Sequence, residues 1–133
     1  MNIVFADTFY FFALLNENDQ AHTQAVEFSK NYRGQIVTTL AVIFELADGL
    51  SKPPRRQIFL PLLQSLRDNP FVTIVDYSAN IMHEALSLYN RYSDKDWSLT
   101  DCVSFVVMQQ NKIATAITGD HHFEQAGFQI LMK

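Results

Sequence analysis

The sequence predicts one α/β domain over residues 1–133, with three layers in which helices cover both faces of a central parallel sheet of about five strands. Short apolar segments alternate with longer amphipathic segments along the whole chain, which is typical of parallel βα units wound right-handed. Apolar residues make up 48% of the chain, and Gly and Pro number only four each. This composition suits a single packed core and leaves little for a flexible linker.

The N-terminal half of the chain supplies two of the strands and three of the helices. Strands are expected at residues 2–6 and 35–38, and helices at residues 8–15, 19–33 and 40–50. Residues 2–6 form an apolar run typical of a strand buried on both faces. Asp19 opens the second helix and Thr39 caps the third, while the sequence Ser51-Lys52-Pro53-Pro54 stops the third.

The C-terminal half continues the alternation. Helices are expected at residues 55–68, 78–92 and 100–111, strands at 71–75, 114–117 and 128–131, and one helical turn at 121–125. Asn69 and Pro70 end the first of these helices, because the residue before a proline avoids the helical conformation. The strand at 71–75 is the clearest in the chain, since it is rich in β-branched residues.

Composition indicates a cytoplasmic protein that does not enter a membrane. Cys102 is the single cysteine, so no internal disulfide can form and a reducing compartment is expected. The longest apolar runs fall far below the roughly 18 residues that span a bilayer, and residues 1–7 lack the features of a signal peptide. The net charge of -4 argues against a protein that holds nucleic acid by charge alone.

Four acidic residues are expected near one edge of the sheet, although they lie far apart in the sequence. Asp7 follows the first strand, and Asp120 follows the fourth. Glu45 lies in the early turns of the helix after the second strand, and Asp101 lies in the first turn of the helix before the fourth. Because parallel sheets bind ligands outside the carboxyl ends of their strands, this edge is the expected site.

Each acid also has a purely structural explanation. Asp7 and Asp120 stand where helix N-caps are common. Asp101 completes a capping-box pattern that begins at Ser98, and Glu45 can be a solvated residue beside the apolar stripe of its helix. Taken singly, each acid is explained at least as well by its structural role as by a metal.

Taken together, the four acids favour a metal site. Four carboxylates that share one crevice repel one another at pH 7, and such a cluster normally persists only if it binds cations or shifts its pKa values. Ligand sets made only of oxygen select hard ions such as Mg²⁺ or Mn²⁺. Ions of this kind bridge a phosphate and activate water, so the pattern predicts metal-dependent hydrolysis of phosphodiester bonds.

Four fragments in a fixed order carry a resemblance to a known family. They are Asp7-Thr8, Phe44-Glu45-Leu46, Ser98-Leu99-Thr100-Asp101 with Ser104-Phe105, and Thr118-Gly119-Asp120-His121-His122-Phe123 with Ala126-Gly127-Phe128. With these fragments the chain resembles, from end to end, a PIN domain of the VapC type, the toxins of prokaryotic toxin–antitoxin pairs.

This resemblance implies an activity, a cofactor and partners. It implies cleavage of single-stranded RNA by an activated water, with Mg²⁺, or Mn²⁺ in its place, held by Asp7, Glu45, Asp101 and Asp120. Thr8 and Thr118 are similar to the residues that orient these carboxylates by hydrogen bonds. The partners it implies are a cognate antitoxin and a second copy of the chain in a homodimer.

Arg55 and Arg56 are candidate RNA contacts outside the acidic set. Both open a helix, where the macrodipole disfavours cations. With Lys52 they place three of the ten basic residues within five positions. An external anion such as RNA explains this placement, and a solvated turn is the alternative.

Other functions are weighed against the nuclease. The four histidines lack the paired spacing of a zinc site, and Cys102, on an apolar helix face, is expected to be a buried, inert thiol. A phosphotransfer domain would need an Asp-x-Asp after the first strand, where the chain has Asp7-Thr8-Phe9. A module on the same fold that binds RNA or protein without cleavage remains the main alternative.

Overall fold

Five parallel strands form the central sheet of the computed structural model, which describes residues 2–133. The strands are β1 (Ile3–Ala6), β2 (Gln35–Thr39), β3 (Val72–Val75), β4 (Thr115–Ile117) and β5 (Gln129–Ile130). The helices are α1 (Thr8–Leu15), α2 (His22–Asn31), α3 (Leu40–Gly49), α4 (Arg56–Asp68), α5 (Ala79–Arg91), α6 (Leu99–Gln110) and α7 (His121–Gln125). Each predicted strand and helix is present, with ends that differ by at most three residues.

The strand order creates a crevice next to β1. The sheet runs β3-β2-β1-β4-β5. The strands β2 and β3 therefore lie on one side of β1, and β4 and β5 lie on the other. In sheets of this kind, ligands bind at the carboxyl ends of the strands where the order reverses. Here that point lies between β1 and β4, which pair through Ala6 and Ile117 at their ends.

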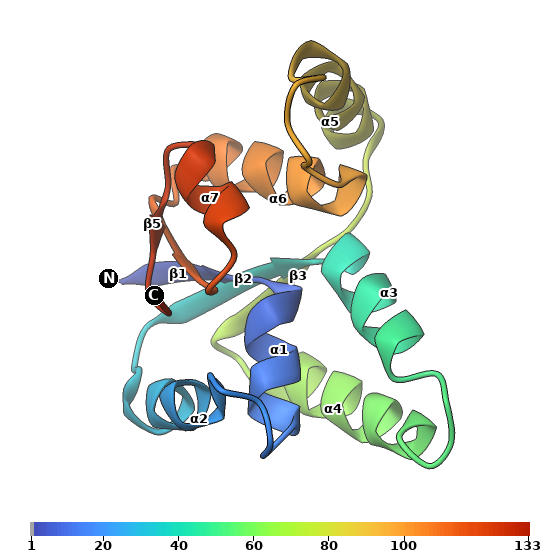
Figure 1. Cartoon of the computed structure of the whole chain (residues 1–133), viewed down its shortest axis with the longest axis vertical. Helices are drawn as coiled ribbons and strands as arrows, with labels where there is room; N and C mark the ends of the chain where they lie inside the picture. Colours follow the sequence, from blue (N-terminus) through green and yellow to red (C-terminus); the bar gives the residue numbers. More distant parts are fainter. Residues whose placement is uncertain (1) are drawn as a thin grey trace.

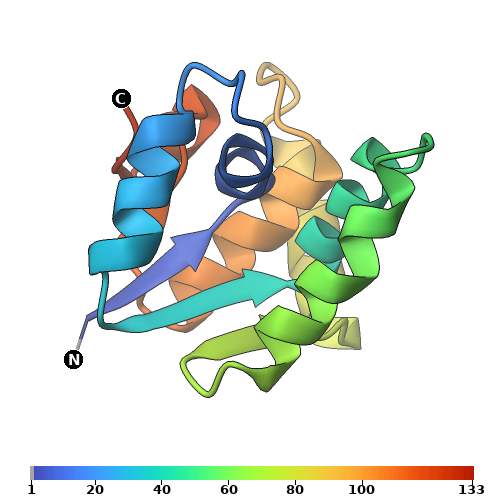
Figure 2. The ribbon, with the colours of Figure 1, turned by 90° about the horizontal axis from the view of Figure 1, so that it is seen from below.

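Helices cover both faces of the sheet, which confirms the predicted three layers. Figures 1 and 2 show α1, α2 and α4 on one face, and α6 and α7 on the other, with α5 packed on α6. The helix α3 lies at the end of the sheet to which the strands point (Figure 1). Among the helices described, none is long and apolar enough to cross a membrane.

One helix begins later than the sequence suggests. Residues 19–33 were expected to be helical from Asp19, but α2 begins at His22. The Asp19 carboxylate accepts a hydrogen bond from the backbone amide of Ala21 at 2.8 Å. An aspartate that bonds two residues ahead closes a turn instead of extending a helix. The cap predicted at Thr39 is present, since its hydroxyl accepts from the amide of Val42 at 3.1 Å.

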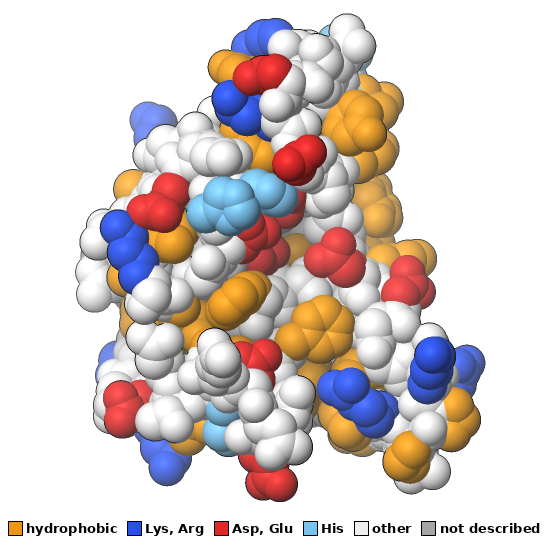
Figure 3. All heavy atoms as spheres, in the orientation of Figure 1, with side chains coloured by type: hydrophobic (Ala, Val, Ile, Leu, Met, Phe, Trp, Pro, Cys, Tyr) orange, Lys and Arg blue, Asp and Glu red, His pale blue; other side chains and the backbone are white. Residues whose placement is uncertain are grey.

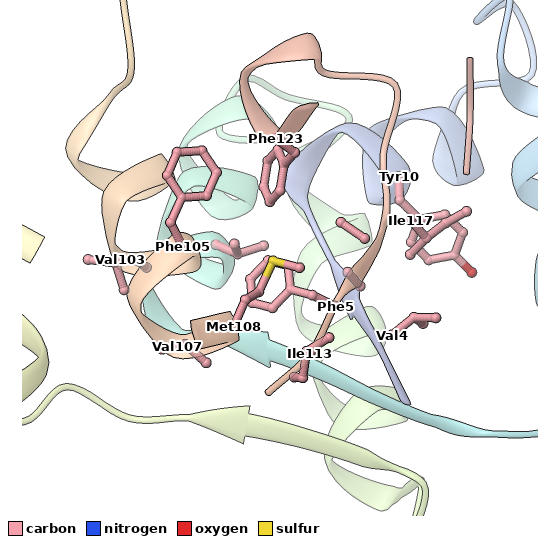
Figure 4. Packing of buried hydrophobic residues seen from close by; sticks show 14 of the residues in the cluster. Val4, Phe5, Tyr10, Val103, Phe105, Val107, Met108, Ile113, Ile117 and Phe123 are labelled. Carbon is pink, nitrogen blue, oxygen red and sulfur yellow. The ribbon is translucent and has the colours of Figure 1, made fainter. Parts of the chain in front are cut away.

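Aromatic rings in the core fix β1 against α6 and α7. Phe105 packs edge-on to Phe123 with ring centroids 5.0 Å apart, and Phe123 lies 6.1 Å from Phe5 of β1. Figure 4 shows these rings with Met108 beneath them. All four side chains are fully buried, and burying each one contributes about 1.5–3 kcal/mol. The cluster therefore holds together the three elements that flank the crevice.

Candidate metal and nuclease site

Asp7 and Thr118 meet at the crevice because they follow paired strand ends. Ala6 and Ile117 are the last residues of β1 and β4, so the next residue of each strand emerges at the same edge. The Thr118 hydroxyl donates a hydrogen bond to Asp7 Oδ2 at 2.9 Å. Both residues are buried, and Asp7 stands at the N-cap of α1 without using its side chain as a cap.

The electrostatics of Asp7 are unusual for a carboxyl group. The pKa of Asp7 is raised to about 7, chiefly by burial; the carboxylates of Asp101 and Asp120 add to the rise, and the Thr118 hydrogen bond opposes it. Burial and like charges both disfavour the ionised form. A cation placed beside Asp7 would offset both effects.

Asp120 is joined to Asp7 through Thr118. The backbone amide of Asp120 donates to Thr118 Oγ1 at 3.0 Å, and its carboxylate caps α7 by accepting from the amide of His122 at 2.9 Å. The structural explanation of Asp120 as an N-cap is therefore correct, and it does not remove the residue from the site. The cap orients the carboxylate toward the same edge as Asp7.

Asp101 approaches from the other side, on the first turn of α6. Its Oδ2 accepts from the amide of Ser98 at 3.1 Å, and Ser98 Oγ accepts in return from the amide of Asp101, which completes the capping box. The same Oδ2 lies 3.0 Å from His122 Nδ1. Burial raises the pKa of Asp101 above its usual value. The hydrogen bonds to described residues all engage Oδ2, which leaves Oδ1 for a ligand.

Glu45 is not linked to the other three acids by hydrogen bonds among residues 2–133. It is exposed on α3, and within residues 2–133 it makes no hydrogen bond or ion pair to Asp7, Asp101 or Asp120. Its helix begins directly after β2, the neighbour of β1. Figure 3 shows acidic side chains over α3 facing those beneath the histidine pair near α7, across a recess in the surface. We call Asp7, Asp101 and Asp120 the acidic cluster, with Glu45 outside it.

The two threonines differ in their contacts. Thr118 bridges two members of the acidic cluster, as described above. Thr8 Oγ1 is buried and has no hydrogen-bond partner among residues 2–133. Buried polar atoms nearly always have a partner, so an unsatisfied hydroxyl one residue after Asp7 suits a site completed by an ion and its water. With an all-oxygen donor set, the residues present fit a hard divalent cation.

His122 is the contact that the sequence did not predict. His122 lies in the short helix α7, and its Nδ1 lies 3.0 Å from Asp101 Oδ2 and 3.4 Å from Asp120 Oδ1. The signal available in the sequence was its position, two residues after Asp120, the acid that follows the fourth strand. Ligand atoms of Asp120, His121 and His122 also lie within 4.8 Å of one another. These three side chains could therefore ligate one ion together, which the spacing of the histidines in the sequence did not predict.

Arg55 and Arg56 lie away from the acidic cluster. Arg55 occupies the N-cap of α4, and Arg56 donates from its guanidinium to the carbonyl of Ser51 at 2.8 Å. Both are exposed. Figure 3 shows basic side chains over the turn between α3 and α4, on the same face of the molecule as the recess.

Cys102 is fully buried, as predicted, and burial raises its thiol pKa to about 11.

Comparison with known proteins assigns the fold to a family. A PIN domain model matches residues 4–129. The chain belongs to the PIN domain family, a family of nuclease domains. The predicted resemblance is thereby confirmed at the level of the family.

Individual PIN proteins are similar over nearly the whole chain. The 23S rRNA-specific endonuclease VapC20 of Mycobacterium tuberculosis is 25% identical over 126 residues, which cover 95% of each chain. The crystal structure of M. tuberculosis VapC20, a sarcin–ricin loop cleaving toxin, superposes with a TM-score of 0.88 at 24% identity over 98% of this chain and 99% of that one. A chain of VapBC2 from Rickettsia felis bound to a promoter DNA fragment gives a TM-score of 0.69 at 18% identity, covering 97% of both.

Proposed function

We propose that this PIN domain is a metal-dependent endoribonuclease that acts as the toxin of a toxin–antitoxin pair. The observation that carries the proposal is the acidic cluster, three carboxylates from three distant segments linked through Thr118 and His122 at the carboxyl edge of the sheet. The VapC20 relative, named as an rRNA endonuclease, supports RNA as the substrate.

A divalent cation, Mg²⁺ or Mn²⁺ in its place, is the proposed cofactor. Asp7, Asp101 and Asp120 would hold it, with Glu45 joining from α3 across the recess. When bound, such an ion supplies Lewis-acid stabilisation of phosphate and a more acidic water. The chain's own residues position the carboxylates: Thr118 fixes Asp7, and Ser98 fixes Asp101.

The proposed test compares the wild type with Asp7→Asn and Glu45→Gln in the same cells and in purified form. The wild type should arrest growth and cleave single-stranded RNA, with cleavage abolished by EDTA and restored by Mg²⁺. Both variants should be produced as folded protein and be harmless. Equal toxicity of wild type and Asp7→Asn would overturn the assignment, and RNA binding without cleavage would favour the non-cleaving module.

Arg55 and Arg56 are proposed to hold the RNA backbone on the same face. Replacing both by Ala should weaken RNA binding. It should also make the slope of log affinity against log salt concentration shallower, by the amount expected for losing up to about two phosphate contacts. Because neither side chain is buried, the fold should be unaffected. Unchanged affinity and an unchanged salt slope would show that these arginines belong to a solvated turn.

Two protein partners complete the proposal. One is a cognate antitoxin, which is supported by structural neighbours solved as toxin–antitoxin complexes, among them one from Klebsiella pneumoniae. The other is a second copy of the chain in a homodimer. Co-expression with a cognate antitoxin should suppress growth arrest if the first holds, and the mass of the purified protein in solution tests the second.

A further inference from the structure

A second recess lies one helical turn from the acidic cluster, at the junction of α5 and α6. It has a volume of about 540 Å³ and is lined by residues of the end of α5 and the loop 92–98. Ser98, one of its lining residues, donates its backbone amide to Asp101. We call it the tyrosine recess, after Tyr89 and Tyr92.

The walls of the tyrosine recess carry exposed aromatic rings. Tyr89 is 52% exposed and Tyr92 is 38% exposed, although rings of this size usually gain by burial. Tyr92 is held in place by Trp97, with ring centroids 5.0 Å apart. Trp97 is itself anchored, because it is 7% exposed and its indole N–H donates to Gln125 Oε1 of α7 at 2.9 Å. The rings therefore form a supported platform.

The charge around the recess suits a flat neutral ligand better than a phosphate. Arg91 and Lys95 are balanced by Asp94 and Asp96, and Lys95 already pairs with Asp94 at 2.9 Å. The side chain of Arg91 lies 5.8 Å from the Tyr92 ring centroid. With no net positive charge, the site lacks the main source of phosphate affinity. Aromatic faces bordered by amide and carboxylate groups, such as those of Asn90 and Asp96, instead match the face and edge of a nucleobase.

We propose that the tyrosine recess binds one unpaired base of the RNA substrate. The base stacks on Tyr89, the more exposed of the two tyrosines, next to the bond that the acidic cluster cleaves. The inference rests on the proposed RNA substrate. Figure 3 shows basic side chains over the end of α5 and the following loop on the same face as the recess beside the histidines. Because Ser98 lines the recess and donates to Asp101 at 3.1 Å, a single strand bound at the acidic cluster would pass next to the tyrosine recess.

Trp97, the only tryptophan in the chain, reports on the recess directly. A single-stranded 12-nucleotide RNA of mixed sequence, titrated in EDTA so that it stays intact, should change Trp97 fluorescence saturably, and the same RNA in a duplex should not. Tyr89→Ala should weaken binding about 10-fold, the scale of losing one base–aromatic stack. Tyr89→Phe keeps the ring and should bind like the wild type. Phe71→Ala removes an equally exposed ring beside β3 and should change nothing.

The outcomes separate this inference from the proposed nuclease function. If Tyr89→Ala binds and cleaves RNA like the wild type and Trp97 fluorescence does not respond, the base site is wrong and the nuclease stands. If the fluorescence change depends on Tyr89 but no RNA is cleaved with Mg²⁺ or Mn²⁺, the base site stands and the nuclease is wrong. A chain that neither binds nor cleaves RNA contradicts both.

Discussion

Asp7 combines the features that make a metal ligand costly to keep without its metal. It is buried, it faces two other carboxylates, and its pKa rises to about 7. A group whose pKa is raised on folding destabilises the folded chain whenever it is ionised. The simplest explanation for a carboxylate in this position is a bound cation that offsets the free-energy cost of its ionisation.

Asp7→Asn should therefore stabilise the metal-free protein above neutral pH. Between about pH 4 and pH 7 the folded chain retains a proton on Asp7 that the unfolded chain has released. The contribution of this group to stability therefore falls as the pH rises through that window, and the loss is complete above it. With one pKa unit equivalent to 1.36 kcal/mol, the gain from the variant is at most about 4 kcal/mol.

Thermal unfolding in EDTA at pH 5 and pH 8 checks this prediction. The melting temperature of Asp7→Asn should exceed that of the wild type at pH 8, and the difference should shrink at pH 5. Adding Mn²⁺ should reverse the order, because the wild type gains stability by binding the ion. A variant less stable than the wild type at pH 8 in EDTA would contradict this account of Asp7.

His122 is expected to position Asp101. A carboxylate only accepts hydrogen bonds, so the contact at 3.0 Å requires a proton on His122 Nδ1. His122→Asn can supply a donor near the position of Nδ1, whereas His122→Gln places its amide nearer that of Nε2. His122→Ala and His122→Gln should lose about 10–100-fold in Mn²⁺ affinity, and His122→Asn should lose much less. Calorimetric titration with Mn²⁺ measures this, and equal losses for Asn and Gln would rule out the positioning role.

At the scale of elements, the site is assembled by the starts of helices. Asp7, Asp101 and Asp120 lie at or within the first turn of α1, α6 and α7. Helix N-termini stabilise negative charge, and this allows three carboxylates to lie close together at the sheet edge. The short connections after β1 and β4 leave little freedom in where these turns begin.

Gly119, between Thr118 and Asp120, is the tightest of these connections. A Cβ at this position would lie 2.5 Å from the Phe9 ring and 2.8 Å from the carbonyl oxygen of Met132. The backbone carbonyl cannot move aside cheaply, so Gly119→Ala should cost about 1–3 kcal/mol and displace Asp120. Chemical denaturation and RNA cleavage should both show the loss. Unchanged stability would mean that this loop is looser than the structure indicates.

The elements were predictable from the sequence because their signals are local. Apolar runs, caps such as Thr39 and breaks such as Asn69-Pro70 each act within a few residues. The start of α2 was missed because Asp19 bonds to Ala21 to close a turn, and the same residue type serves both turns and caps. Local rules cannot separate these uses without the tertiary packing.

The site was predictable only in part. The carboxyl ends of the strands indicated where Asp7 and Asp120 would lie, and the capping box indicated the geometry of Asp101. The contact of His122 with Asp101 joins residues 21 positions apart, so it depends on how α7 packs against α6. The position of Glu45 relative to the acidic cluster likewise depends on the placement of α3, which no pattern within that helix defines.

At the scale of the whole molecule, one face carries all the proposed RNA contacts. The arginines at the start of α4, the acidic cluster and the tyrosine recess follow one another across it, as Figures 1 and 3 show for the elements concerned. A net charge of -4 is compatible with RNA binding because the arginines and the aromatic stack do not depend on net charge, and bound metal would neutralise the acids. The sequence alone could not predict how these features are arranged in space, because they come from distant segments that only the folded sheet brings onto one face.

The central claim is that the acidic cluster holds a divalent cation, and anomalous diffraction from an Mn²⁺-soaked crystal tests it most directly. The account predicts a peak about 2.1 Å from carboxylate oxygens of Asp7, Asp101 and Asp120, the distance at which Mg²⁺ binds such oxygens. A peak confined to His121 and His122, or no peak at the carboxyl edge of β1 and β4, would contradict it.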